Sequence, residues 1–333
     1  MSWRIGPKIE EILRKGGDGG GISREEALAL MHLELESPET YATMACANHL
    51  SRQRFGRKGE RHMHIGLNVE PCPMDCAFCS LTKRAGLFRE RMDFPLDDIL
   101  AWARQGEAEG VDALNLMSTG TFPFERLLAI GRRLAREVRV PLVANARDIT
   151  HAEGEQLLAA GFVGFYHAIR LGEGRDTPFD PARRLQTVRV LRDVGLQWMN
   201  CVEPVGPEHS AEEMVELMLL ARREGATYSG VMRRINFPGS PKTSCGMISE
   251  RRLAQIVAVS RLVMGDTVRA HCIHEPHSLS LVAGANLVFP EVGSSPRDGQ
   301  ADTGKGRGHS NGQCAVLLRE MEWNPDLPSN CFS

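Results

Sequence analysis

The chain has 333 residues, a hydrophobic share of 42% and a formal net charge of −2. This balance creates no overall field that would favour nucleic acid or an anionic membrane, and no run of 18 or more apolar residues is present to form a transmembrane helix. The charged N-terminus lacks the apolar core of a secretory signal. We therefore expect a cytoplasmic protein whose nine cysteines are metal ligands or buried thiols rather than disulfides.

The first 60 residues read as helical. Residues 7–15 and 23–54 are predicted helices, separated by the glycine-rich segment DGGG at 18–21. Ser23 with Glu26 three residues later is the pattern of a capping box, which marks the start of the second helix. We interpret residues 1–60 as an N-terminal helical extension of the main domain.

Residues 61–290 alternate between short apolar runs and amphipathic helical stretches, several of which end in glycine. This alternation is typical of an α/β protein with a parallel sheet, and eight strands are the number that closes a TIM-type (βα)8 barrel. An open doubly wound sheet is the alternative, but no GxGxxG follows the first run. The predicted strands are residues 64–69, 113–118, 140–145, 163–169, 197–203, 228–235, 268–273 and 285–290.

Residues 291–333 differ in composition from the barrel. The segment EVGSSPRDGQADTGKGRG is rich in glycine, serine and charge, and we expect it to form a loop over the barrel mouth. A short helix, CAVLLREMEW, follows, and the last ten residues are expected to be extended and mobile.

The strongest chemical signal is a loop of three cysteines directly after the first predicted strand. Cys72, Cys76 and Cys79 have the spacing C-x3-C-x2-C. Three thiolates can hold three irons of a [4Fe–4S] cubane and leave the fourth iron open to a ligand. A closed zinc site would need a fourth ligand at finger spacing, which is absent, and His62 and His64 are more simply strand residues.

This spacing, with Phe78 just before the last cysteine, resembles the hallmark of the radical S-adenosylmethionine superfamily. The resemblance implies that the open iron binds the amino and carboxylate groups of S-adenosylmethionine. One electron from the cluster then cleaves the cofactor to a 5′-deoxyadenosyl radical, and a flavodoxin or ferredoxin supplies the electron. The protein positions the cofactor, which carries the difficult chemistry.

The resemblance extends over most of residues 50–320 and is similar to the biotin synthase branch of that superfamily. The segment GFYHAIRLGEGRDTPFDPARRLQTV places Arg170, Glu173 and Arg184 where the family holds the carboxylate and amine of the cofactor. Arginine suits a carboxylate and glutamate an ammonium group, although solvated surface charges are the alternative. The family's second cofactor loop corresponds to MSTGTF, which implies contacts from Ser118, Thr119 and Gly120.

The chain departs from the well-known biotin synthases, which carry a second cluster inside the barrel. Two of the corresponding cysteine positions are Leu116 and Ala144 here, so ordinary biotin synthase activity is not expected. Spare cysteines with the inward parity of strand residues still allow a second iron–sulfur cluster, and lone buried thiols are the alternative. The hypothetical ligands are Cys201, Cys272, Cys314 and Cys331, with Cys245 as a substitute.

A second cluster would make sulfur insertion into an unactivated C–H bond the leading chemistry. The tail resembles the two-protein lipoyl synthases, which implies an octanoyl-lysine substrate on a lipoyl carrier protein and a second radical enzyme as partner. Arg297, Lys305 and Arg307 would then meet an acidic carrier surface, and a merely solvated loop is the alternative.

Other functions stay open. Small-molecule rearrangement or cleavage, as in methylornithine synthase or the maturase HydE, needs only the first cluster, and a non-enzymatic iron–sulfur carrier would never cleave the cofactor. Position at the carboxyl ends of strands suggests substrate contacts from Asn145, Glu203 and His274, and no catalytic residue is assigned.

Overall fold

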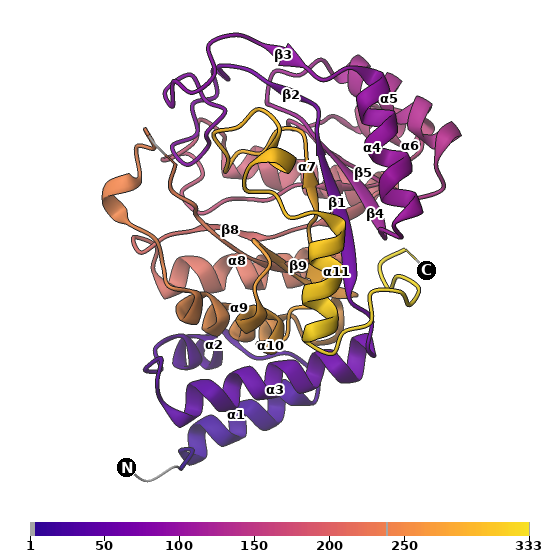
Figure 1. Cartoon of the computed structure of the whole chain (residues 1–333). Helices are drawn as coiled ribbons and strands as arrows, with labels where there is room; N and C mark the ends of the chain where they lie inside the picture. The colour runs from indigo at the N-terminus through magenta and orange to yellow at the C-terminus, as the bar shows by residue number, and fades with distance from the viewer. Residues whose placement is uncertain (1–3, 238, 333) are drawn as a thin grey trace.

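A computed structural model describes residues 4–237 and 239–332 of the chain. Eight parallel strands pair in a closed cycle, so the predicted TIM-type barrel is confirmed (Figure 1). All eight apolar runs named from the sequence contribute a strand. In cyclic order the strands are β1 (Glu60–Gly66), β4 (Ala113–Met117), β5 (Leu142–Asn145), β6 (Phe162–Tyr166), β7 (Gln197–Met199), β9 (Tyr228–Arg233), β10 (Ala270–His274) and β11 (Leu287–Val288).

Four short strands supplement the barrel. The predicted fifth strand is interrupted after β7, and its continuation β8 (Val202–Val205) pairs with β9. β12 (Glu291–Val292) pairs parallel with the second half of β1, beyond the end of β11. β2 (Asn68–Val69) pairs antiparallel with β3 (Met92–Asp93) beside the cysteine loop.

Helices surround the strands because each presents an apolar side to the outward-facing residues of the sheet. Ser210 and Glu213 form a capping box at α8, one of several side-chain caps that satisfy the first amide groups. No helix within the described residues is long and apolar enough to cross a membrane. The helices are α4 (Leu96–Ala108), α5 (Phe124–Glu137), α6 (His151–Ala159), α7 (Pro181–Val194), α8 (Ala211–Glu224), α9 (Glu250–Met264), α10 (Ser278–Val282) and α11 (Asn311–Glu320), with 3-10 turns at Thr243–Cys245, Gly265–Thr267 and Thr303–Lys305.

The N-terminal extension consists of α1 (Pro7–Gly17), α2 (Arg24–Met31) and α3 (Pro38–Phe55), which lie against α8, α9 and α10 (Figure 1). The single helix expected over residues 23–54 is wrong. Ser37 caps a new helix and Pro38 occupies its first turn, where a missing amide hydrogen costs nothing. The capping box predicted at Ser23 is present and begins α2.

Residues 291–309 cross the carboxyl end of the barrel. They pass so close to the end of β1 that a Cβ on Gly66 would lie 2.1 Å from backbone atoms of Ser294, so only glycine permits this crossing. The chain then forms α11 on the outside, and the last residues run to the opposite end of the barrel. There Trp323 and Cys331 are buried, and the backbone amide of Asn330 donates to Glu60. Residues 329–332 are therefore fixed at the start of β1, whereas the sequence suggested a mobile end over the mouth.

Candidate active site

The three-cysteine loop leaves the end of β1 and folds over the carboxyl end of the barrel. Its backbone is fixed by hydrogen bonds from the amide of Cys72 to the carbonyl of Leu81, at 2.9 Å, and from the amide of Lys83 to the carbonyl of Cys72, at 3.0 Å. Cys72, Cys76 and Cys79 all line the same cavity, together with Phe78. The structure thus brings together the three cysteines that the sequence predicts as ligands of one cluster.

Burial favours the protonated form of these three thiols as long as no metal binds to their sulfur atoms. Removal from water raises the pKa of Cys76 to about 11, and it raises the pKa values of Cys72 and Cys79 as well. The charge of Cys72 also raises the pKa of Cys76, and the charges of Cys76 and Cys72 raise that of Cys79, because these thiolates would lie close together. A cationic iron–sulfur cluster core would compensate these charges, so the donor set fits such a cluster, with proton release on binding.

The opposite side of the cavity begins at the end of β4. Ser118, Thr119 and Gly120 line the cavity as expected. The Asn68 side-chain amide donates to Thr119 Oγ1 at 2.8 Å and its oxygen accepts from the Thr119 amide at 3.2 Å. The buried carboxylate of Glu70 accepts a short hydrogen bond from the same hydroxyl. These contacts hold the 118–120 backbone in one conformation beside the cysteine loop.

Arg170 is the central charged residue of the cavity wall. Its Nε donates to Glu203 Oε1 at 3.0 Å, and the second oxygen of Glu203 accepts from the hydroxyl of Tyr166 at 2.5 Å. Burial works against the charge of Arg170, but Glu203 and Glu173 raise its pKa, so it is a permanent cation. Arg170, Glu203 and Tyr166 all line the cavity.

Glu173 is placed differently from the prediction that it faces the amine of a cofactor. Its carboxylate accepts from the backbone amide of Arg170 at 2.6 Å and from the hydroxyl of Thr177 at 3.0 Å. Among the described residues it does not line the cavity. Its oxygens are used to shape the loop after β6, so the structure supports a positioning role for this side chain.

Arg184 is buried rather than solvated and reaches the cavity from α7. Its guanidinium donates to the carbonyl of Ala168 at 2.7 Å and to Asp148 Oδ1 at 3.3 Å. Burial opposes the charge of Asp148, but the nearby His167 and the guanidinium of Arg184 lower the pKa of this carboxyl to about 2. The guanidinium of Arg184 therefore lines the cavity while it is paired with Asp148.

The substrate contacts predicted from strand ends all line the cavity: Asn145, Glu203 and His274. Nε2 of His274 lies 3.2 Å from Nδ1 of His64 and 3.3 Å from Nη1 of Arg297. Burial and the nearby guanidinium hold the pKa of His274 well below its ordinary value, so the ring is neutral at pH 7.

Arg297 is not a surface residue, so its expected role at a carrier surface is wrong. It is 7% exposed and donates from Nη2 to Glu291 at 2.6 Å, with its guanidinium in the cavity wall. Lys305 and Arg307 remain exposed; the guanidinium of Arg307 pairs with Glu275.

The four spare cysteines do not form one group. Cys201 and Cys272 lie inside the barrel. Cys272 is on β10, as strand alternation predicts, whereas Cys201 lies in the break between β7 and β8 and not on a strand. Burial together with the neighbouring Cys272 raises the pKa of Cys201 well above its ordinary value. Gly230 permits the close approach of Cys272, because a Cβ there would lie 1.9 Å from the carbonyl oxygen of Cys272 and 2.6 Å from its sulfur. Cys314 faces apolar side chains beneath α11, outside the barrel interior, so its predicted place in a shared ligand set is wrong.

Cys331 and Cys245 have separate surroundings. Cys331 lies in the barrel interior at the end where β1 begins, opposite the cysteine loop. Cys245 is on a 3-10 turn in the loop after β9 and does not join the interior cluster.

Sequence reasoning missed two groups that shape the cavity: Tyr166, which holds Glu203, and Glu291, which holds Arg297. Tyr166 lies near the carboxyl end of a predicted strand, and it could have been found by the rule that functional residues of such barrels lie at these strand ends. Glu291 begins the segment rich in glycine, serine and charge, where no sequence pattern marks its contact.

Comparison with known proteins gives relatives by sequence and by structure. The chain is 27% identical over 302 residues to the biotin synthase of Nocardioides sp., covering 85% of this chain and 80% of the relative. It is 26% identical over 292 residues to that of Trichlorobacter lovleyi, covering 82% and 86%. No protein-family model matches the chain.

Solved structures that share the fold include a maturase and a synthase. The [FeFe]-hydrogenase maturase HydG from Carboxydothermus hydrogenoformans superposes with a TM-score of 0.80 at 18% identity, covering 98% of this chain and 80% of that one. Methylornithine synthase superposes with a TM-score of 0.78 at 16% identity, covering 94% and 97%.

Proposed function

We propose that this chain, a distant relative of the biotin synthases in the radical S-adenosylmethionine superfamily, binds a [4Fe–4S] cluster through Cys72, Cys76 and Cys79. The observation that carries the proposal is the placement of the three thiols along one cavity at the carboxyl ends of the barrel strands. With S-adenosylmethionine bound in that cavity, cluster and cofactor together supply a radical able to remove hydrogen from an unactivated carbon.

The chain's own residues bind and orient the cofactor. The guanidinium of Arg170 faces the cavity and can hold a carboxylate by paired hydrogen bonds, while Glu203 fixes its direction. The backbone of Ser118, Thr119 and Gly120 offers carbonyl acceptors for an ammonium group on the facing wall. Phe78 adds an apolar side chain to the cavity beside the cysteine loop.

The specific reaction in this proposal is sulfur insertion into an octanoyl chain on a lysine of a lipoyl carrier protein. It is supported by the adjacent thiols of Cys201 and Cys272, which would form the core of a second iron–sulfur site in the barrel interior. An electron donor such as flavodoxin or ferredoxin, and a second radical enzyme, complete the proposed reaction. Exposed Lys305 and Arg307 are the candidate contacts for an acidic carrier.

A small-molecule rearrangement or cleavage is the second candidate. It is supported by the polar wall of His274 and Arg297, the latter paired with Glu291, because this wall suits a compact polar substrate better than an alkyl chain. This candidate needs no second cluster.

Counting iron and sulfide after anaerobic reconstitution separates the candidates. The cluster proposal predicts about four irons removed by the Cys72/Cys76/Cys79→Ala replacement. Sulfur insertion predicts further iron and sulfide that survive this replacement and are lost in Cys201→Ala/Cys272→Ala. No iron beyond the first cluster would refute sulfur insertion, and iron unaffected by the triple replacement would refute the cluster assignment itself.

A further inference from the structure

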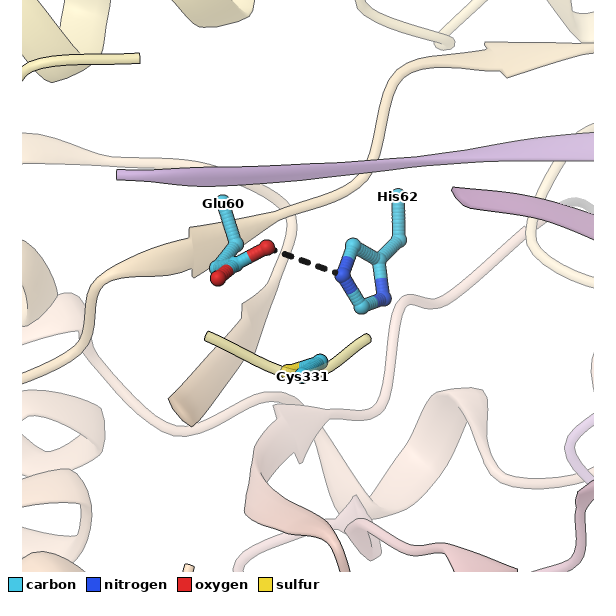
Figure 2. Close-up of side chains that lie close together, drawn as sticks. All are labelled: Glu60, His62 and Cys331. Carbon is cyan, nitrogen blue, oxygen red and sulfur yellow. Dashed lines mark hydrogen bonds and ion pairs between the residues drawn. The ribbon is translucent and has the colours of Figure 1, made fainter. Parts of the chain in front are cut away.

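The barrel end opposite the cysteine loop holds a second group of ligand-type side chains. Glu60 and His62 of β1 and Cys331 of the C-terminal tail are all fully buried. A carboxylate oxygen, an imidazole nitrogen and the sulfur all lie within 4.8 Å of one another. Figure 2 shows the three side chains converging from the strand and from the tail.

The three residues are brought together by ordered backbone. Glu60 and His62 are two residues apart on one strand, so strand alternation turns both toward the barrel interior. The tail is fixed by the amide of Asn330, 2.6 Å from Glu60 Oε1, and by the hydroxyl of Ser329, 2.9 Å from Oε2. Arg269 donates to the carbonyl of Cys331 at 3.2 Å.

The spacing of Glu60 and His62 fits two ligands of one metal ion as well as it fits a hydrogen bond. Nε2 of His62 lies 3.3 Å from Oε2 of Glu60, a long hydrogen bond, since N–H···O bonds cluster near about 2.9–3.0 Å. Two ligands about 2.0–2.1 Å from a tetrahedral zinc ion are separated by about 3.3 Å. The buried Glu60 carboxylate is compensated by His62 and by Lys58, which is itself paired with Asp112 at 2.7 Å, and a dication held by the three ligands would add to this compensation.

We propose that Glu60, His62 and Cys331 form a mononuclear zinc site that fastens the C-terminal tail to the barrel, independently of the proposed function. Thiolate, imidazole and carboxylate are the ligand types zinc takes in proteins, and a water molecule would complete the tetrahedron. Binding at Nε2 leaves the imidazole proton on Nδ1, and the thiol of Cys331 releases one proton. The competing assignment places Cys331 on an iron–sulfur cluster with Cys272, which requires inorganic sulfide.

The test is elemental analysis of the full chain, purified anaerobically from zinc- and iron-supplemented cells. Wild type and Cys314→Ala, the matched control at another buried cysteine of the C-terminal region, should each contain about one zinc per chain. Cys331→Ala and His62→Gln should lose zinc at least about tenfold, because each removes one of three protein ligands, while iron stays unchanged. The unchanged iron also shows that the barrel mouth has folded.

Cobalt substitution gives a readout that needs no destabilising variant. Cobalt added to zinc-depleted wild type should produce a thiolate-to-cobalt charge-transfer absorption, abolished by competing zinc, and Cys331→His should still bind metal but lose this absorption. The proposal is overturned if wild type holds no zinc. It is also overturned if Cys331→Ala keeps its zinc, because the metal would then be bound elsewhere, for example at the Cys72 loop. Loss of iron and sulfide in Cys331→Ala would overturn it in favour of a cluster ligand.

Discussion

Replacement of Arg170 by methionine tests how the cavity recognises its cofactor. Methionine keeps much of the side-chain volume but removes the guanidinium that lies 3.0 Å from Glu203 and lines the cavity. A hydrogen bond to a charged group contributes about 1.5–3 kcal/mol. Since about 1.4 kcal/mol is tenfold in affinity, the Kd for S-adenosylmethionine should rise by roughly 10- to 150-fold.

The same replacement leaves the buried carboxylate of Glu203 without its cation, so the free energy of unfolding should also fall, by about 3–5 kcal/mol. Binding must therefore be measured on folded, cluster-loaded protein, by anaerobic titration calorimetry with iron content determined on the same sample. Arg175→Met is the matched control, because this arginine of the same loop is 59% exposed and its surface ion pairs contribute little. A Kd for Arg170→Met within about twofold of wild type, at equal iron content, would refute the role given to this guanidinium.

Two further predictions concern stability. Lys58→Met should lower the free energy of unfolding by about 3–5 kcal/mol, because Lys58 and Asp112 are a buried pair 2.7 Å apart; a loss below about 1 kcal/mol in denaturant titration would contradict this. Asp148→Asn should be less stable than wild type by about 2 kcal/mol at pH 7, since the Asp148 pKa is lowered from 3.8 to about 2. Wild type loses this contribution as the pH falls from about 4 to about 2, so the difference in melting temperature should narrow there, and a constant difference would count against the pairing.

The barrel and its cysteine loop were predictable because local patterns encode them. Each strand is an apolar run between helical stretches, and the ligands Cys72, Cys76 and Cys79 lie within one loop. The break in the helix expected over residues 23–54 is also encoded locally, because Ser37 and Pro38 mark the start of a new helix. The helical pattern on both sides of these two residues obscured it.

The contacts that could not be predicted join distant segments. Asn330 donates to Glu60 across 270 positions of sequence, and nothing in the tail composition marks that contact. Parity along a strand placed Cys272 inside the barrel, and Cys201 lies there too although its predicted strand is interrupted at that residue. No such rule applies to Cys314, whose position depends on how α11 docks outside β1.

The most direct test of the central claim is reductive cleavage of S-adenosylmethionine by the reconstituted chain. With a low-potential reductant and no oxygen, wild type should form 5′-deoxyadenosine and methionine, detected by liquid chromatography and mass spectrometry, while Cys76→Ala should form neither. Cofactor left intact by wild-type protein that holds its iron and sulfide would contradict the claim and leave an iron–sulfur carrier as the function of this chain.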